Sequence, residues 1–295
     1  MDSLERYRDI VPDFEGFRAI QNLPLLHSAR VNTLKVDRSH LLAHLNEEGI
    51  GYRIFEWYPL GLALDVESPG KLLANLQGYM HIQEEVSMVP PLILDPQPGE
   101  QILDLCASPG SKTTQIAQMM ENRGLVVANE PSLSRVAPLR SNCERLGVLN
   151  VAITRYDGRL FPRGAFHRIL VDAPCSSEGR ARRGQSVLLR CSLKRSLDLQ
   201  ALQIGLLKNA VRLVEPGGVV VYSTCTYAPE ENELVVAEVL PEAHLESASI
   251  PGLKGCPGIT QWQGRELNED LALCTRYYPH INDTGGFFVA KLIKD

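Results

Sequence analysis

Two cysteines fifty residues apart are the residues whose type and setting most directly suggest chemistry in this chain. Cys175 lies in the segment VDAPCSSEG and Cys225 in the segment VVVYSTCTYAPEENE. Each follows a run of apolar and β-branched residues, 168–171 and 218–222, which predicts a buried parallel strand that ends where the sequence turns polar. In an open α/β sheet the ligand cleft lies beyond the carboxyl ends of the strands, so both thiols can reach one bound molecule. The pair therefore predicts covalent chemistry with a nucleophile and a helper.

Four other cysteines, Cys143, Cys191, Cys256 and Cys274, have no chemical neighbours in the sequence. Because cysteine often serves as a small buried apolar residue, we expect these four to pack in the interior. The seven cysteines are odd in number, scattered and without a C-x-x-C pair, which argues against a zinc site and against a complete disulfide framework. We therefore expect no bound metal, and reduced thiols in a cytoplasmic protein.

The overall composition is that of an ordinary globular protein. The chain has 295 residues, of which 44% are hydrophobic and 22% charged, enough for one large core and a smaller second one. The N-terminal segment MDSLERYRDIVPDFEG is charged and lacks the apolar stretch of a signal peptide, and no apolar run is long enough to span a membrane. We therefore expect neither secretion nor membrane insertion.

Positive charge is concentrated in one short stretch of an otherwise acidic chain. The net charge is −5, yet residues 180–195 contain six cations and no acidic residue. This basic segment contains Arg180, Arg182, Arg183, Arg190, Lys194 and Arg195. It is either a solvated face or a phosphate-binding surface, and its start five residues after Cys175 favours the second. The side chains that we expect to meet nucleic-acid phosphates are Arg182, Arg183, Lys194 and Arg195.

The order of predicted elements divides the chain into two parts. Residues 1–80 mix short helical and strand patterns, which predicts a small α/β appendage. From Gln101 onward, apolar strands alternate with helical patterns, and this alternation predicts a mostly parallel, doubly wound sheet. The predicted strands are 102–106, 125–129, 151–154, 168–173, 218–223 and 286–294, and the predicted helices lie near 112–121, 134–146 and 196–214. We therefore predict a Rossmann-like catalytic domain over residues 81–295.

The turn after the first of these strands, in CASPGSKTTQIAQMM, leads through Pro-Gly into a helix whose N-terminal amides suit a carboxylate or a phosphate. It is not a P-loop, because Ser111 separates Gly110 from Lys112, and it lacks the dinucleotide motif G-x-G-x-x-G. Glu130 ends the second strand, where a carboxylate can accept both ribose hydroxyls, and Asp157 follows the third, where it can accept from the adenine amine. Each acid alone is more typical of a solvated loop. Their ordered succession predicts S-adenosylmethionine as the cofactor.

Eight segments of the chain also follow a known order: ARVNTLKV, QEEVSMVPPLIL, DLCASPGSKT, VVANEPS, RYDGRLF, VDAPCSSEG, YSTCTYAPEENE and YYPHINDTGGFFVAKL. Together they resemble the Nop/Sun family of RNA cytosine-5 methyltransferases over nearly the whole chain. The resemblance implies a Rossmann-like fold, S-adenosylmethionine as the cofactor, RNA as the partner and methylation of cytosine at carbon 5. It also implies that residues 1–80 form an RNA-binding appendage.

The resemblance implies roles for individual residues. Asp172 matches the carboxylate that orients cytosine, Cys225 the nucleophile and Cys175 the cysteine that releases the product, and Lys112 joins this catalytic set. The cofactor contacts implied are Cys106, Ala107, Ser108, Pro109, Gly110, Ser111, Lys112, Glu130, Arg135, Asp157 and Asp172. The chain departs from the common pattern at SPGS, at the second serine of PCSSEG and at Glu130, which replaces a common Asp. These conservative changes bear on affinity and leave the reaction intact.

The implied groups suit the chemistry of cytosine. Carbon 5 becomes nucleophilic only after a thiolate adds to carbon 6, and a free cysteine has a pKa of about 8.5, so the site must favour the anion. The cofactor's sulfonium and Lys112 can do so. Asp172 can bond the amine and ring-nitrogen edge of cytosine, which selects cytosine over uracil. Cys175 is placed to assist loss of the carbon-5 proton, after which Cys225 can leave. A target base inside a helix would have to be unstacked first.

Several alternatives concern the substrate. DNA cytosine methyltransferases use a Pro-Cys nucleophile, which would be Cys175 here, and need no second pair such as Thr224-Cys225, so RNA is favoured over DNA. A non-catalytic RNA-binding assembly factor is the alternative from another class. Because the chain ends just after GGFFVAKL, we expect no added RNA-binding domain and favour transfer RNA, as in short archaeal members, with ribosomal RNA second. We expect a monomer.

Overall fold

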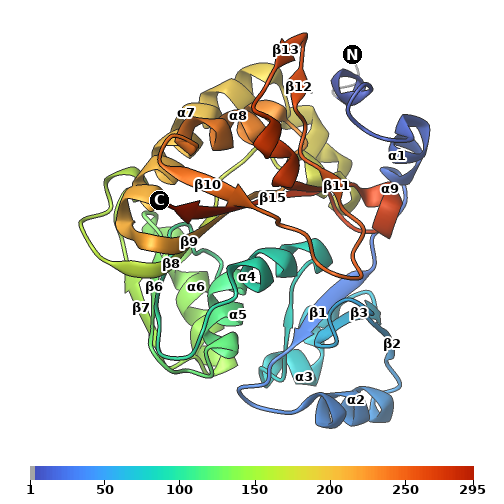
Figure 1. Ribbon diagram of the computed structural model, residues 1–295. Coiled ribbons are helices and arrows are strands. Elements are labelled where there is room, and N and C mark those ends of the chain that lie inside the picture. Colours follow the sequence, from blue (N-terminus) through green and yellow to red (C-terminus); the bar gives the residue numbers. More distant parts are fainter. Residues whose placement is uncertain (1–3) are drawn as a thin grey trace.

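The computed structural model describes residues 4–295, apart from the side chains of Gln185 and Arg190, and a nine-stranded mixed sheet forms its centre (Figure 1). Five neighbouring strands, in the order β9, β8, β5, β6, β7, are parallel, and β15 runs antiparallel to β9. Their bounds are β5 Gln101–Asp104, β6 Leu125–Asn129, β7 Val151–Thr154, β8 Phe166–Asp172, β9 Val214–Thr224 and β15 Phe287–Lys294. The predicted Rossmann-like α/β fold is confirmed.

Helices cover both faces of this sheet because alternate residues of each strand point to opposite sides. Ile169 and Val171 of β8 face one apolar cluster, which α7 and α8 complete, whereas Leu170 faces a second cluster completed by α4, α5 and α6. The helix bounds are α4 Val89–Leu94, α5 Ser111–Met119, α6 Leu133–Leu146, α7 Leu193–Leu213 and α8 Glu233–Val236. The two-sided burial explains why the central strands are continuous apolar runs in the sequence.

The sheet extends beyond β15 through short strands that the sequence pattern does not predict. β10 Ala243–Glu246 pairs with β15, and β14 Thr275–Tyr277 links β15 to β11 Cys256–Pro257. A separate hairpin joins β12 Gln261–Trp262 to β13 Arg265–Glu266. The remaining short helices of this part are η4 Gly158–Leu160, η5 Glu178–Arg183, η6 Gln185–Arg190, η7 Pro229–Glu231, η8 Ala237–Val239, η9 Glu269–Leu273 and α9 Pro279–Asn282.

A second, four-stranded antiparallel sheet lies in the N-terminal part, in the order β2, β3, β1, β4. It packs with α2 around its own apolar cluster, which includes Leu41, Leu45, Leu62 and Met80. The bounds are β1 His27–Val31, α2 Arg38–Glu47, β2 Gly51–Ile54, β3 Gly61–Asp65, η2 Pro69–Lys71, α3 Leu73–Leu76, β4 Met80–Ile82 and η3 Glu85–Met88. The sequence predicts a small α/β appendage over residues 1–80, and that assignment remains a prediction.

The first helices pack elsewhere. η1 Glu5–Tyr7 and α1 Phe14–Ile20 lie against the larger part, where the Phe17 ring is 5.0 Å from that of Tyr227 and α1 lies beside α9 (Figure 1). We propose a division of the chain into two units at about residue 80. The helices η1 and α1 precede this boundary but pack against the larger unit.

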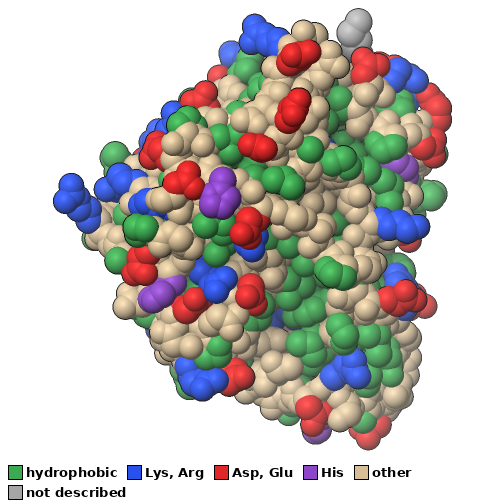
Figure 2. Space-filling view, in the orientation of Figure 1, with side chains coloured by type: hydrophobic (Ala, Val, Ile, Leu, Met, Phe, Trp, Pro, Cys, Tyr) green, Lys and Arg blue, Asp and Glu red, His purple; other side chains and the backbone are tan. Residues whose placement is uncertain are grey.

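Charged side chains are mixed over much of the surface. Figure 2 shows acidic and basic side chains interspersed over one face, with hydrophobic side chains gathered between its upper and lower parts. None of the helices described in residues 4–295 combines the length and apolar character needed to cross a membrane.

Arg182 of the basic segment is an internal structural residue. It is only 8% exposed, and its guanidinium donates to the carbonyls of Leu23, Pro24 and Thr284 and pairs with Asp283 at 2.7 Å. The expectation that Arg182 meets a phosphate is therefore wrong, because its donors are already used by the protein. The Arg190 side chain lies outside the described residues, and Lys194 and Arg195 are exposed on the first turn of α7.

Replacing Arg182 by methionine tests this structural role. Arg182→Met leaves three carbonyls without their donor, so the free energy of unfolding should fall by about 1–3 kcal/mol in urea titrations. The matched change Arg183→Met, at an exposed side chain one residue on, should stay within about 0.5 kcal/mol of the parent. Equal effects of the two substitutions would contradict the assignment.

Candidate active site

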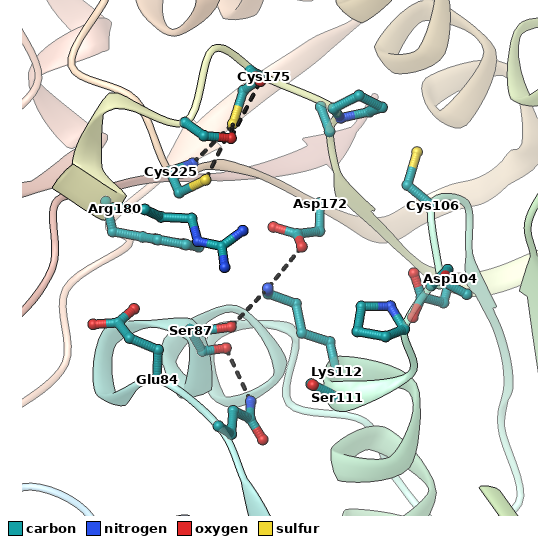
Figure 3. A pocket seen from close by; sticks show the side chains of 18 of the residues that line it. Glu84, Ser87, Asp104, Cys106, Ser111, Lys112, Asp172, Cys175, Arg180 and Cys225 are labelled. Atoms are coloured by element: carbon teal, nitrogen blue, oxygen red, sulfur yellow. Dashed lines mark hydrogen bonds and ion pairs between the residues drawn. The ribbon is translucent and has the colours of Figure 1, made fainter. Parts of the chain in front are cut away.

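A cavity of about 370 Å³ lies where β5, β8 and β9 end (Figure 3). It is open at the carboxyl ends of these parallel strands, the position expected for a ligand cleft in such a sheet. Its lining includes ten of the residues predicted from the sequence: Cys106, Ala107, Ser108, Pro109, Ser111, Lys112, Arg135, Asp172, Cys175 and Cys225. Gly110, Glu130 and Asp157 do not belong to this lining. The structure thus brings the two thiols and the loop after β5 to one site.

The two cysteines are in contact. In the pairing of β8 with β9, Asp172 lies opposite Ser223, so the chain leaves both strands at the same edge of the sheet and carries Cys175 and Cys225 into one space. Their Sγ atoms are 3.3 Å apart, and the backbone N–H of Cys225 lies 3.4 Å from the sulfur of Cys175. This geometry lets one thiol donate to the other sulfur.

The contact shifts the two pKa values in opposite directions. The thiol of Cys175 donates to the sulfur of Cys225 and so lowers the pKa of Cys225, with a further contribution from Ser177, against the raising effects of burial and of Asp172. The same interaction, together with burial, raises the pKa of Cys175 well above its ordinary value. The arrangement favours a thiolate at Cys225 and a protonated Cys175.

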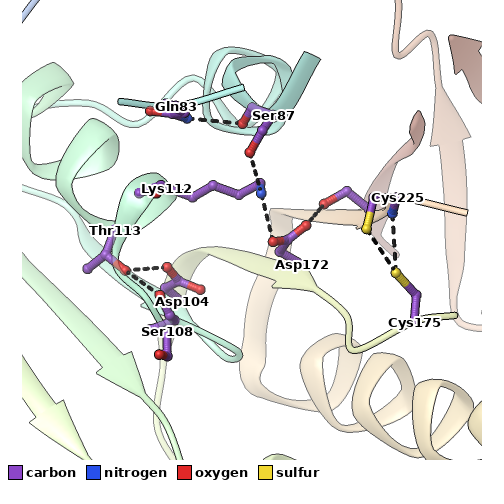
Figure 4. A network of polar contacts seen from close by, with 12 residues as sticks. Gln83, Ser87, Asp104, Ser108, Lys112, Thr113, Asp172, Cys175 and Cys225 are labelled. Atoms are coloured by element: carbon purple, nitrogen blue, oxygen red, sulfur yellow. Dashed lines mark hydrogen bonds and ion pairs between the residues drawn. The ribbon is translucent and has the colours of Figure 1, made fainter. Parts of the chain in front are cut away.

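Asp172 is held in place by a network of polar contacts (Figure 4). Its Oδ2 atom accepts from Lys112 Nζ at 2.7 Å, and its Oδ1 atom accepts from the Ser223 hydroxyl at 2.9 Å. Lys112 also donates to the Ser87 hydroxyl at 2.9 Å, and its ammonium lies 5.5 Å from the centre of the Phe287 ring. The Asp172 side chain keeps 31% of its surface exposed. It therefore presents a fixed acceptor edge to the cavity.

The loop between β5 and α5 is shaped by glycine and by long-range contacts. Gly110 has φ = 104°, a left-handed conformation that favours glycine, and it forms the N-cap of α5. Arg135 donates to the Ser108 carbonyl at 3.0 Å, and Asn142 donates to the Pro109 carbonyl at 2.9 Å, so α6 holds the loop from outside. The backbone amides that begin α5 are thereby fixed beside the cavity.

Asp104 is a lining residue to which the sequence analysis assigned no role. It ends β5, is 1% exposed, and accepts from the Thr113 hydroxyl through Oδ2 at 2.6 Å. Its Oδ1 atom is buried without a hydrogen-bond partner among the described residues. Burial raises the pKa of Asp104 to about 6, against the opposing hydrogen bond from Thr113. An acid at the last position of the first strand, directly before the Pro-Gly turn, is the signal that could have identified it.

Glu84 and Ser87 also line the cavity and come from the segment 83–88 that follows β4. The Oε1 atom of Glu84 accepts from the Gly285 N–H at 3.0 Å, which joins this segment to a loop 201 residues away. Burial raises the pKa of Glu84, against the charge of Arg183. Both residues lie in the matched segment QEEVSMVPPLIL, but nothing in their spacing indicates contact with the chemistry.

The two predicted nucleoside contacts lie at the expected strand ends. Glu130 follows β6, is 2% exposed and accepts from the Ser132 N–H at 2.9 Å, and its second oxygen is 3.4 Å from Arg135. Asp157 follows β7 and forms an ion pair with Arg159, whose hydrogen bonds lower the pKa of Asp157. Their contacts with the cofactor remain predictions.

Comparison with known proteins shows which sequences and structures this chain resembles. Over 99% of its length it is 39% identical to the tRNA (cytosine(49)-C(5))-methyltransferase of Pyrococcus abyssi, of which it covers 95%. It is 39% identical, over 92% of its length, to the ribosomal RNA small subunit methyltransferase F of Shewanella amazonensis, but spans only 59% of that relative. A crystal structure of a methyltransferase homolog from Pyrococcus horikoshii aligns with a TM-score of 0.88 at 34% identity, covering 99% of this chain and 94% of that one.

A second solved structure, NSun6 from Pyrococcus horikoshii with SFG, aligns with a TM-score of 0.87 at 27% identity over 99% of this chain and 97% of that chain. The fold is that of a Rossmann-like, S-adenosylmethionine-dependent methyltransferase. Residues 91–293 match the family described as 16S rRNA methyltransferase RsmB/F, and the chain belongs to this family. The resemblance drawn from the sequence motifs is confirmed.

The influence of Cys175 on Cys225 can be measured without any substrate. Cys175→Ala removes the thiol donor, so the pKa of Cys225 should rise and its alkylation by iodoacetamide at neutral pH should slow by roughly three- to ten-fold. Peptide mass spectrometry of Cys225 over a series of pH values gives the rates. Cys143→Ala, at a buried cysteine outside the cavity lining, serves as the control. An unchanged or faster reaction in Cys175→Ala would show that the lowered pKa has another cause.

Proposed function

We propose that this protein transfers the methyl group of S-adenosylmethionine to carbon 5 of a cytosine in RNA, with transfer RNA as the favoured substrate. The observation that carries the proposal is the contact between Cys225 and Cys175 beside the fixed carboxylate of Asp172. The relatives named above support it, since they carry the names of transfer-RNA and ribosomal-RNA methyltransferases.

The residues around the cavity fit the cofactor. The buried Oδ1 atom of Asp104 has no partner among the described residues and suits the ammonium of the methionine part. The amides at the start of α5 suit its carboxylate, and Glu130 and Asp157 at the next two strand ends suit the ribose and the adenine. Bound there, S-adenosylmethionine supplies an electrophilic methyl group on a sulfonium.

Each remaining step of the reaction is assigned to a side chain of this protein. Asp172 orients cytosine by accepting from its exocyclic amine, beside N3, and Lys112 fixes that carboxylate. The Cys225 thiolate adds to carbon 6, forming a carbon–sulfur bond and making carbon 5 nucleophilic for the methyl. Once Cys225 is bonded, its charge no longer raises the pKa of Cys175, which can then ionise and remove the carbon-5 proton. Loss of that proton expels Cys225 and restores the aromatic ring.

The RNA class rests on the relatives. At the same identity of 39%, the transfer-RNA relative matches 99% of this chain and the ribosomal-RNA relative 92%, which supports transfer RNA as the favoured substrate. Among residues 4–295 no group of three or more metal-ligating side chains is arranged to hold an ion.

The seven cysteines are all free, which supports our proposal of a cytoplasmic enzyme. We propose that it acts as a monomer.

The different roles of the two thiols predict different defects when each cysteine is replaced by alanine. Cys225→Ala should lose several orders of magnitude in turnover, because the covalent nucleophile is gone. Cys175→Ala should still attack RNA but fail to release it, leaving a protein–RNA adduct that survives denaturant. Labelled S-adenosylmethionine with transfer RNA, followed by denaturing gels, measures both outcomes. The adduct should vanish in the double variant. An adduct in Cys225→Ala that is absent from Cys175→Ala would reverse the roles.

The cofactor contacts predict a pH dependence that separates two acids. Asp104→Asn should weaken binding of S-adenosylhomocysteine by about 1–3 kcal/mol at pH 8, because a neutral amide then faces the ammonium. The pKa of Asp104 is raised to about 6 in the free protein, so parent affinity should fall as the pH drops through that value, and the Asn variant should lose this dependence. Titration calorimetry measures both.

Glu130→Ala should cost a similar free energy, about 1–3 kcal/mol, because two ribose hydroxyls lose their acceptor. It should leave the pH dependence near 6 in place. Glu121→Ala, at an exposed acid outside the cavity lining, is the control. Parent-like affinity in either active-site variant would remove that residue from the cofactor site.

A further inference from the structure

The helical turn η5, which carries the first arginines of the basic segment, is joined directly to the nucleophile. The N–H of Gly179 donates to the Cys225 carbonyl at 2.9 Å, and the Gly286 N–H donates to the Gly179 carbonyl at 2.8 Å. A Cβ atom at position 179 would lie 2.2 Å from the Gly286 carbonyl oxygen, so only glycine allows this approach. The position of Arg180, the next residue, is therefore fixed relative to Cys225.

Arg180 and Arg183 face the cavity, whereas Arg182 between them is turned into the protein. Both are exposed, both line the cavity, and Figure 3 shows the Arg180 guanidinium pointing into it on the side of Cys225. The inward anchoring of Arg182 on backbone carbonyls fixes which way the turn faces.

These two guanidinium groups have no hydrogen bond or ion pair within the described residues, and their charges act at longer range on the Glu84 carboxylate of the same lining. The other cations of the lining do have partners, since Lys112 is paired with Asp172 and Arg135 donates to the Ser108 carbonyl. Arg180 and Arg183 therefore present free N–H donors and two positive charges beside the nucleophile. An arginine fork of this kind matches the geometry of a phosphate group.

The chemistry of the reaction indicates which phosphate of the target nucleotide lies close to Cys225. Cys225 adds to carbon 6 of cytosine, and carbon 6 is bonded to N1, the atom that carries the ribose. In the common anti conformation of a pyrimidine nucleotide, the carbon-6 edge lies over the 5′ side of the sugar. A group that attacks carbon 6 is therefore close to the 5′-phosphate of the same nucleotide.

We propose that Arg180 and Arg183 form the binding site for the 5′-phosphate of the target cytidine. The inference rests on the proposed function and deepens it, because it adds a phosphate site to the base site formed by Cys225 and Asp172. It reassigns the basic segment: the arginines at its start hold the target nucleotide, Arg182 holds the fold, and the exposed cations at the start of α7 lie outside the cavity lining.

Protection of Cys225 from iodoacetamide tests the site with defined probes. Cytidine, cytidine 5′-monophosphate and cytidine 3′-monophosphate are titrated in the presence of S-adenosylhomocysteine, and alkylation of Cys225 is followed by peptide mass. In the parent protein the 5′-monophosphate should protect at roughly ten-fold lower concentration than cytidine, the effect of one or two charge-assisted hydrogen bonds. The 3′-monophosphate should resemble cytidine.

Matched variants identify the residues. Arg180→Met and Arg183→Met should each reduce the advantage of the 5′-monophosphate, Arg180→Lys should keep part of it, and Arg163→Met, at an exposed arginine outside the cavity lining, should keep all of it. An advantage that persists in both methionine variants, or that belongs to the 3′-monophosphate in the parent, overturns the inference. If the parent methylates RNA but shows no 5′ advantage, the phosphate site alone fails. If it neither methylates RNA nor is protected by any cytidine compound, the proposed function fails with it.

Discussion

The parallel pairing of β8 with β9 is the constraint on which the rest of the site depends. Because Asp172 and Ser223 are opposite each other in this register, the loops after the two strands begin side by side, and their cysteines reach contact without any further element between them. The same register lets the Ser223 hydroxyl hold the carboxylate of Asp172. A slip of one residue between the two strands would turn one of these side chains to the opposite face of the sheet and so break the contact between Ser223 and Asp172.

The small N-terminal unit also takes part in this arrangement. Arg30 of β1 is buried and donates to Gln83, Gln118 and Thr114, so it ties the antiparallel sheet to α5, the helix that follows the cofactor loop. The chain then passes through β4 into η3, which delivers Ser87 to Lys112. A movement of the small unit would therefore shift Ser87 and, through it, Lys112, which holds Asp172.

The sequence allowed the central strands and the two thiols to be predicted, because both depend on local patterns. An apolar run that turns polar marks a strand end, and Cys175 and Cys225 follow such ends, as does Glu130. The fate of Arg182 could not be predicted, since its partners are backbone carbonyls about 100 to 160 residues away and any residue type supplies a carbonyl. The short strands β10 to β14 escaped prediction because two to four residues are too few for a period.

The close approach of Gly179 to Gly286 has a consequence for how sequences of this kind can vary. The two glycines are 107 positions apart, yet their backbones touch, and Gly286 is followed directly by Phe287 beneath the ammonium of Lys112. A side chain introduced at Gly179 would displace the segment around Gly286 and, through it, an aromatic wall of the cavity, whereas one introduced at Gly286 would meet the ring of Tyr227. A related protein that carries a side chain at the position of Gly179 must therefore place its partner segment differently, and a chimera that combined that segment with this chain's Gly286 segment would contain a steric conflict that neither parent contains.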